Sequence, residues 1–382
     1  MEIKEIRVFK MNLPLNEPFS ISFKTYTQAQ NVLVIIETDE GIEGYGEGSP
    51  DKSITGDSQE EALSFLRVVA KQLVGKPVDI ELIHENLKTI ESNLGFKSQT
   101  GKAAIDMACY DIIGKKLGKP VYKILGLAKP RLVPTSLTIG IKTLEETVKS
   151  ARKYVEAFEK NGLKRIKLKL SGNPEEDIRR VMKLSEVFAG EITLDANQGY
   201  KNPEVAVKVF NKLYEALGSR ILFVEEPCPK GDLAMMKYVN DNSPIPVIAD
   251  ESVTSIEDAE KVIRQKSASG INIKLQKSGG IYYASKIATL AGEKGFKLMV
   301  GCNEETYLAI SASVNFVAGT PHISSADLDS DILLNLNITN ENPIDSFKEG
   351  CRVPVEKPGL GVRIADWLKA IINGQIFLAP VA

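Results

Sequence analysis

Six charged residues recur along the second half of the chain at the spacing of one strand–helix unit, and each ends an apolar, strand-like run. A buried ionised side chain is costly unless it pairs with an opposite charge or binds a metal. Charges in these positions therefore indicate chemistry rather than stability. In a parallel α/β barrel, the C-terminal ends of the strands form the catalytic face. The six residues are Lys169, Asp195, Glu225, Asp250, Lys274 and Asp327.

Three of the six are carboxylates that end consecutive expected strands, namely Asp195, Glu225 and Asp250. At one barrel mouth they would repel one another unless a hard cation lay among them, and ligation by oxygen alone suits Mg²⁺ better than zinc. Each alone could be a helix N-cap or a solvated loop acid, but three in register predict one Mg²⁺ per subunit. Neighbouring polar residues are expected to orient these ligands, although the amide among them could equally be a turn residue. They are Glu226, Glu251 and Asn197.

The lysines are expected to handle protons. Strand periodicity places Lys167 and Lys169 on one face of their strand, so in a barrel both point into the lumen, whereas on an edge strand they would be solvated. Lys274 would reach the lumen from the opposite side. Two lysines flanking a metal can each take or return a proton on a carbon next to a carboxylate, while the cation stabilises the enolate. Lys167 and the metal would lower the pKa of Lys169, and Lys167 itself would stay charged beside the enolate oxygen.

The first part of the chain, residues 1–125, is expected to form an α+β domain. Its antiparallel strands are expected at Ile3–Met11, Asn31–Thr38 and Gly41–Gly48, and its helices at Ser58–Leu73 and Lys102–Leu117.

The second part, residues 126–345, alternates eight strand-like runs with helical stretches, which predicts a parallel barrel. Two helix starts carry an Asn N-cap before proline, at Asn173 and Asn202. The tail, residues 346–382, is expected to return to the first domain. The runs are Ser136–Ile139, Ile166–Leu170, Ile192–Leu194, Leu222–Val224, Pro246–Ile248, Ile271–Leu275, Lys297–Val300 and His322–Ala326.

Bulk composition excludes several classes of protein. The 382 residues carry a formal net charge of -2, which speaks against nucleic-acid and membrane-surface partners. Four cysteines without CxxC spacing indicate reduced thiols, and no apolar run approaches the ~20 residues of a membrane span, so we expect a cytoplasmic protein. The two histidines, His84 and His322, are expected to be structural, which disfavours a His-ligated zinc hydrolase.

Five segments together resemble the muconate-lactonising subgroup of the enolase superfamily. The resemblance implies a modified (β/α)7β barrel with an α+β capping domain, whose loop near residues 19–30 covers the substrate. It also implies that Asp195, Glu225 and Asp250 bind Mg²⁺ and that Lys169 and Lys274 are the acid/base catalysts. The segments are Lys167–Lys169, Asp195–Gly199, Val224–Pro227, Ala249–Ser252 and Asn272–Leu275.

Within this subgroup, Asp327 and Asp329 resemble the paired aspartates that bind the α-ammonium group in dipeptide epimerases. Lys24 stands where members acting on Ala-Glu carry an arginine, so a preference for an acidic C-terminal residue is expected, without the bidentate fork. Glu304 replaces a usually apolar residue. It either favours a larger or cationic N-terminal residue or is an acid at a helix N-terminus.

We therefore expect an isomerase, a Mg²⁺-dependent dipeptide epimerase that inverts the α-carbon of the C-terminal residue by two-base 1,1-proton transfer through an enolate. Two alternatives remain. An o-succinylbenzoate synthase or lactonising enzyme would use the same metal and lysines, but its substrate would leave Asp327 and Asp329 without a partner. A non-catalytic ligand-binding barrel would exchange no substrate proton. A homo-oligomer is expected, since barrels of this kind often associate through exposed helices.

Overall fold

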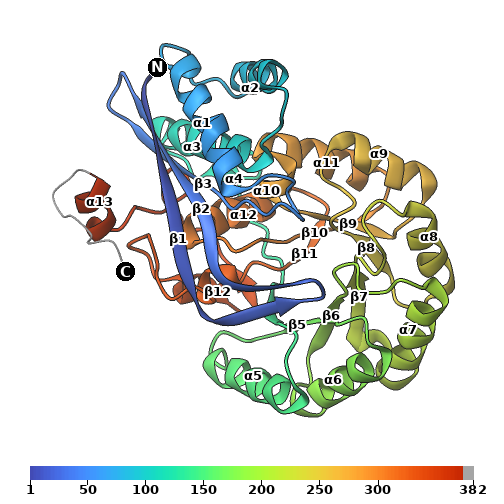
Figure 1. Ribbon diagram of the computed structural model, residues 1–382. Coiled ribbons are helices and arrows are strands. Elements are labelled where there is room, and N and C mark those ends of the chain that lie inside the picture. Colours follow the sequence, from blue (N-terminus) through green and yellow to red (C-terminus); the bar gives the residue numbers. More distant parts are fainter. Residues whose placement is uncertain (373–382) are drawn as a thin grey trace.

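The computed structural model describes residues 1–372 and contains a barrel of eight parallel strands surrounded by helices (Figure 1). Neighbouring strands follow chain order, and a parallel bridge between Thr135 and Ala326 joins the first strand to the last. The predicted barrel is thus confirmed. Its strands are β4 (Ser136–Ile139), β5 (Arg165–Lys169), β6 (Glu191–Asp195), β7 (Ile221–Glu225), β8 (Val247–Ala249), β9 (Gly270–Ile273), β10 (Lys297–Val300) and β11 (Ile323–Ala326).

Helices between the strands begin at local signals in the sequence. Asn173 and Asn202 accept hydrogen bonds from the first turns of α6 and α7, each ahead of a proline, as predicted. The ninth strand ends earlier than expected, at Ile273, because Lys274 already caps a short helix. The barrel helices are α5 (Leu144–Ala157), α6 (Pro174–Val187), α7 (Pro203–Leu217), α8 (Leu233–Asn242), α9 (Ile256–Gln265), α10 (Leu275–Ser278), α11 (Ile281–Glu293) and α12 (Tyr307–Gly319), with a 3-10 turn η1 (Gly218–Arg220).

The N-terminal part forms a three-stranded antiparallel sheet covered by helices. Its first two strands are much longer than expected, and residues 19–30, expected as a loop, form the outer end of their hairpin. Cross-strand pairs such as Phe19 with Tyr26 continue the ladder to the tip of the hairpin, in a stretch whose sequence does not predict a strand. The elements are β1 (Ile3–Ile21), β2 (Lys24–Thr38), β3 (Glu43–Gly48), α1 (Gln59–Leu73), α2 (Ile80–Leu94), α3 (Gln99–Leu117) and α4 (Val121–Ile124).

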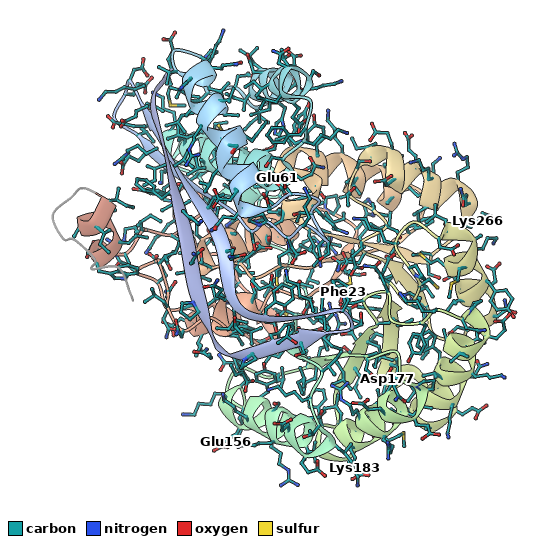
Figure 2. The ribbon with its side chains drawn as sticks, viewed as in Figure 1. Phe23, Glu61, Glu156, Asp177, Lys183 and Lys266 are labelled. Carbon is teal, nitrogen blue, oxygen red and sulfur yellow. The ribbon has the colours of Figure 1, made fainter. Side chains whose placement is uncertain are left out.

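The hairpin β1–β2 reaches across the barrel mouth. Figure 2 places Phe23 at its tip, over the barrel, and the neighbouring Ser22 hydroxyl donates to the Asn197 carbonyl after β6. At the other end, buried Glu47 of β3 accepts hydrogen bonds from the backbone N–H groups of Thr306 (3.0 Å) and Ala309 (3.3 Å) at the start of α12. The capping part therefore contacts the barrel on both sides of its mouth.

The C-terminal segment touches both parts of the molecule. Thr135 N–H donates to the Gly350 carbonyl at the barrel, and Leu360 N–H donates to Asp111 of α3. Residues 373–382 of the expected tail lie outside the described residues. Within residues 1–372, no helix combines the length and apolar character needed to cross a membrane. The elements are η2 (Ser330–Ile332), η3 (Pro343–Ser346), β12 (Phe347–Lys348), β13 (Cys351–Arg352) and α13 (Asp366–Ile372).

Candidate active site

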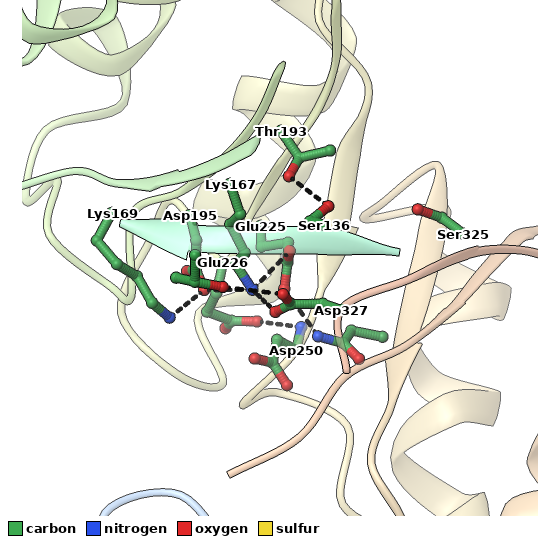
Figure 3. A network of polar contacts seen from close by, with 12 residues as sticks. Ser136, Lys167, Lys169, Thr193, Asp195, Glu225, Glu226, Asp250, Ser325 and Asp327 are labelled. Carbon is green, nitrogen blue, oxygen red and sulfur yellow. Dashed lines mark hydrogen bonds and ion pairs between the residues drawn. The ribbon is translucent and has the colours of Figure 1, made fainter. Parts of the chain in front are cut away.

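Strand register brings the predicted site residues together. Lys169, Asp195 and Glu225 are successive Cα partners across β5, β6 and β7, so their side chains leave the sheet at the same level. Asp250 follows the end of β8, and Lys274 follows the end of β9. Figure 3 shows this network at the C-terminal ends of the strands. Alternation along parallel, in-register strands is the physical reason that a pattern in sequence becomes a cluster in space.

Asp195, Glu225 and Asp250, called here the acidic triad, form a site that fits a divalent cation. Each offers one carboxylate oxygen, these oxygens lie within 4.8 Å of one another, and all three residues are fully buried. Glu225 Oε1 and both Asp250 carboxylate oxygens accept no hydrogen bond of good geometry from residues 1–372, although lysine ammonium groups approach them. Hard, ionised oxygen donors with free lone pairs are the ligands that Mg²⁺ prefers.

The electrostatics of the triad are uneven. Burial alone would raise the pKa of Asp195, but the ammonium groups of Lys167 and Lys169 outweigh it and lower this pKa to about 2. Burial and the charges of Asp195 and Asp250 raise the pKa of Glu225 to about 8, because the single nearby ammonium group of Lys167 only partly opposes them. Three carboxylates in one buried space therefore cannot all ionise easily without added positive charge.

The neighbours of the triad lie where they can orient it. Glu226 Oε2 accepts the Asp250 N–H at 2.7 Å, and the Asn197 side chain donates to Glu251 at 3.0 Å. The Asn197 N–H also donates to Asp195 Oδ1 at 3.0 Å. Sequence reasoning missed Asn272, whose amide donates to Glu225 Oε2 at 2.7 Å from inside β9. The feature that could have identified Asn272 is that it is the one polar residue in an otherwise apolar strand, on the face that points into the barrel lumen.

Lys167 lies at the centre of the network. Its Nζ is 3.0 Å from Asp195 Oδ2, 2.9 Å from Glu225 Oε1 and 2.6 Å from Asp327 Oδ2. Burial would lower its pKa, but the carboxylates of Asp195, Asp327 and Glu225 raise it well above the usual value. These three carboxylates therefore favour the ammonium form of Lys167.

Lys169 and Lys274 approach the triad from its two sides in strand order. Lys169 Nζ lies 2.7 Å from Asp195 Oδ2, and Lys274 Nζ lies 2.9 Å from Asp250 Oδ2. Both side chains line the same cavity beneath the capping hairpin. Burial would lower the pKa of Lys274, but Asp250 and Glu251 outweigh it and raise this pKa. Such a pair can place an amine on each face of a substrate carbon held between them.

Lys277 is a further lysine at the triad that the sequence analysis did not single out. It is fully buried, and its Nζ lies 2.8 Å from Asp250 Oδ1. The helix α10 places Lys277 three residues after Lys274, so both ammonium groups meet the same carboxylate. The sequence predicted a strand at Ile271–Leu275, whereas β9 ends at Ile273 and α10 begins at Leu275. The helical turn that brings Lys277 to Asp250 was therefore not predicted.

Asp327 and Asp329, called here the aspartate pair, line the same cavity. Thr138 of β4 binds both: its hydroxyl donates to Asp327 Oδ1 at 3.0 Å and its N–H to Asp329 Oδ2 at 2.5 Å. The expectation that both aspartates lack a partner without a substrate ammonium group is wrong for Asp327, because Lys167 pairs with it. Asp329 has no such cation among the described residues, and burial together with Asp327 raises its pKa to about 7.

Lys24 lies at the tip of the capping hairpin, at the start of β2, and its side chain is 45% exposed. Its Nζ pairs with Asp51 Oδ2 at 2.6 Å, and Tyr26 donates to the same oxygen at 2.8 Å. Lys24 is absent from the residues that line the cavity, whereas Tyr26 is one of them. The positive charge of Lys24 is thus neutralised within the capping hairpin and its contacts.

Glu304 lines the cavity, and no lysine or arginine in residues 1–372 forms an ion pair with it. Burial, together with Asp51, raises its pKa. Of its two readings, the acid at a helix N-terminus is the weaker, because Thr306 is the N-cap of α12 and Glu47 binds that helix start. The carboxylate of Glu304 is left facing the substrate space.

Two family models cover most of the chain. The model for the mandelate racemase / muconate lactonizing enzyme N-terminal domain matches residues 3–126, and the enolase C-terminal domain-like model matches residues 148–367. Two relatives cover it at similar identity. An N-succinyl-L-Arg/Lys racemase of Bacillus cereus is 33% identical over 96% of both chains. An L-Ala-D/L-Glu epimerase of Clostridium acetobutylicum is 34% identical over 95% of this chain and 99% of the relative.

Among solved structures, a dipeptide epimerase from Enterococcus faecalis in complex with Mg and the dipeptide L-Leu-L-Tyr superposes with a TM-score of 0.87. It is 33% identical and covers 95% of this chain and 99% of its own. Agreement extends over both the capping part and the barrel. The chain therefore belongs to the enolase superfamily, in the group of mandelate racemase and muconate-lactonising enzymes.

Proposed function

We propose that the protein is a Mg²⁺-dependent dipeptide epimerase that inverts the α-carbon of the C-terminal residue. One observation carries the proposal: Lys169 and Lys274 lie on the two sides of the acidic triad, in a cavity that the aspartate pair also lines. Relatives that act on dipeptides support it. A lactonising or succinylbenzoate-forming enzyme would leave Asp329 without an ammonium partner.

The reaction needs one proton removed and one returned at the same carbon. Mg²⁺ bound by the acidic triad supplies a Lewis acid that stabilises negative charge on the substrate carboxylate. Lys169 or Lys274, as a neutral amine, takes the α-proton, and the electron pair of the C–H bond moves into the carboxylate as an enolate. The other lysine, as an ammonium, then donates a proton to the opposite face. The configuration is inverted, and the two lysines have exchanged protonation states.

The walls of the cavity suggest which dipeptides bind. The aspartate pair is placed to bind the α-ammonium group, with Asp329 supplying a carboxylate that forms no ion pair within residues 1–372. Glu304 then favours a cationic side chain on the N-terminal residue. Lys24 pairs with Asp51 in the absence of substrate, so the expected preference for an acidic C-terminal residue requires Lys24 to exchange this partner.

The test is an exchange assay in D₂O with L,L-dipeptides and Mg²⁺, in which mass spectrometry locates deuterium and chiral chromatography measures inversion. Wild-type enzyme should incorporate deuterium at the C-terminal α-carbon and form the L,D product. Lys169→Ala and Lys274→Ala should each abolish inversion, and each should retain exchange of only one epimer. Lys261→Ala, on an exposed helix face, is the control and should behave as wild type.

Two outcomes would overturn the proposal. One is inversion that survives in the double variant lacking both lysines. The other is faster turnover of N-succinyl amino acids than of any dipeptide, since N-succinylation removes the ammonium group that the aspartate pair is proposed to bind.

A further inference from the structure

Arg352 is a buried arginine at the end of the β12–β13 hairpin, and its side chain is 2% exposed. All three guanidinium nitrogens donate hydrogen bonds. Nε donates to the Leu328 carbonyl at 2.9 Å, Nη1 to the Ser346 hydroxyl at 2.6 Å, and Nη2 to the carboxylate of Asp331. The guanidinium carbon also lies 3.8 Å from the centroid of the Phe347 ring. A planar, five-donor group is needed to serve these acceptors together, so lysine cannot replace it fully.

These contacts fall on the chain that carries the aspartate pair. Leu328 lies between Asp327 and Asp329, and its peptide groups are held on both sides. Its N–H donates to the Thr135 hydroxyl at 3.0 Å, and its carbonyl accepts from Arg352. Just beyond, Asp331 pairs with the same guanidinium inside η2. Arg352, a residue of the C-terminal segment, thus holds the backbone of the aspartate pair on the side away from the cavity.

The front of the same chain faces the cavity. There Thr138 binds both carboxylates of the aspartate pair, and Lys167 binds Asp327. None of these front contacts fixes the Leu328 peptide itself. The Leu328 peptide is held by Thr135 and Arg352, and Asp327 N–H donates to the Val300 carbonyl, so the positions of the two carboxylates depend in part on Arg352.

We propose that Arg352 is a positioning residue for substrate recognition: by holding the Leu328 peptide, it sets the two carboxylates at the separation that binds the α-ammonium group of a dipeptide. The inference rests on the proposed function. It assigns Arg352 no contact with substrate, so the chemistry at the lysines should proceed almost normally once substrate is bound.

The experiment measures KM and kcat for L,L-dipeptide epimerisation in wild type, Arg352→Lys and Arg352→Met, with thermal unfolding recorded for each. Arg165→Met is the matched control, because Arg165 is a buried arginine at the start of β5 that donates to Glu191 and to the Ser325 hydroxyl and makes no hydrogen bond to the Leu328 peptide. The substrate is a dipeptide with N-terminal L-alanine. Its N-propionyl analogue, in which hydrogen replaces the ammonium group of that alanine, serves as a competitive inhibitor.

Arg352→Met should raise KM about tenfold or more and lower kcat by less than about threefold. Arg352→Lys should recover part of the loss, and it keeps the test available if the methionine variant does not fold. The inhibition constant of the analogue should change by less than about twofold, because it has no ammonium group to place. Arg165→Met should lower thermal stability and leave KM unchanged.

Equal losses of affinity for dipeptide and analogue would overturn the inference, as would a fall in kcat at constant KM in the Arg352 variants. Failure of the proposed function has a different signature. In that case wild-type enzyme exchanges no dipeptide α-proton, and both proposals fall together.

Discussion

The Asp329 carboxyl group predicts how substrate binding should vary with pH. Burial and the neighbouring Asp327 raise the pKa of Asp329 to about 7, and the ionised form is the one that attracts an ammonium group. Dipeptide affinity should therefore rise as pH increases through about 7, until the α-amino group of the substrate loses its own proton near a pKa of about 8. Calorimetric titration of a dipeptide into the Lys169→Ala, Lys274→Ala double variant measures binding without turnover.

Asp329→Asn in the same background is the control for this pH dependence. It should bind the dipeptide more weakly above pH 7 and show no rise in affinity through that range. The conservative amide keeps the shape of the side chain, and its oxygen can still accept the Thr138 N–H. Affinity that stays constant through neutral pH in the parent protein would contradict the assignment.

Glu304 predicts substrate preference. An unpaired carboxylate in a cavity lined by Leu15, Phe19 and Ile21 should bind a cationic side chain more strongly than it would in water. Glu304→Gln should lower kcat/KM for dipeptides with N-terminal arginine or lysine by about tenfold or more, and should change it little for N-terminal alanine. Glu145→Gln, on the exposed face of α5, is the matched control. Equal effects on cationic and neutral dipeptides would disprove a specificity role.

At the scale of elements, the barrel could be predicted because eight short apolar runs alternate with helical stretches, and six of these runs end in a functional charge. β4 and β10 have the bounds expected from their residues, and the other barrel strands differ by at most a few residues. The site followed from the barrel, because parallel register converts equivalent strand ends into neighbours in space. Spacing in the sequence was therefore sufficient to group Lys169 with the acidic triad.

Elements held by tertiary contacts were missed. The outer half of the β1–β2 hairpin contains Pro14 and Pro18, and its register shifts between Pro14 and Phe19, so its strands depend on backbone pairing and on contacts such as Ser22 with Asn197. The place of Lys277 beside Asp250 depends on where β9 ends and α10 begins, which the sequence did not predict. Arg352 lies in a two-residue strand, and its importance comes from partners distant in the sequence, such as Leu328. No local pattern carries that information.

The contact between β3 and α3 makes a prediction about the capping sheet. A Cβ added at Gly46 would lie 1.9 Å from the Ala104 carbonyl oxygen, a backbone atom that cannot turn aside. Gly46→Ala should therefore separate strand from helix and lower the free energy of unfolding by about 3 kcal/mol. Gly41→Asn is the control, because nothing lies near its Cβ position and asparagine tolerates its positive φ of 74°. Chemical denaturation measures the free energy of unfolding of both variants. Equal losses of this free energy in Gly46→Ala and Gly41→Asn would refute the packing argument.

At the scale of the whole molecule, the capping part and the barrel complete one site. The cap contributes Tyr26 and the apolar cavity wall, and the barrel contributes Lys169, Lys274 and the aspartate pair. The acidic triad, also from the barrel, lies in contact with these two lysines. Glu47 joins the two parts at the start of α12, and Arg352 joins the C-terminal segment to the chain beside the site. Substrate recognition should thus be sensitive to changes in three segments that are far apart in sequence.

Metal binding should also be visible in the stability of the whole molecule. Fully buried carboxylates that repel one another destabilise the folded state, and a cation that binds only that state stabilises it by mass action. At about 100 times its dissociation constant, Mg²⁺ should add about 2.7 kcal/mol to the free energy of unfolding. Chelation should reverse the gain. Differential scanning calorimetry across a Mg²⁺ series measures it without reference to activity.

Glu225→Gln separates this electrostatic account from a general effect of salt. The Glu225 carboxyl group, with its pKa of about 8, is mostly protonated at neutral pH without metal, and glutamine keeps the acceptor for the Asn272 amide, so without metal the variant should unfold near the wild-type temperature. It should then lose most of the Mg²⁺-induced rise, because one ionised ligand is gone. Asp241→Asn, which changes an exposed acid on α8, should keep the full rise. A similar rise in all three proteins would mean that Mg²⁺ acts at the surface rather than at the acidic triad.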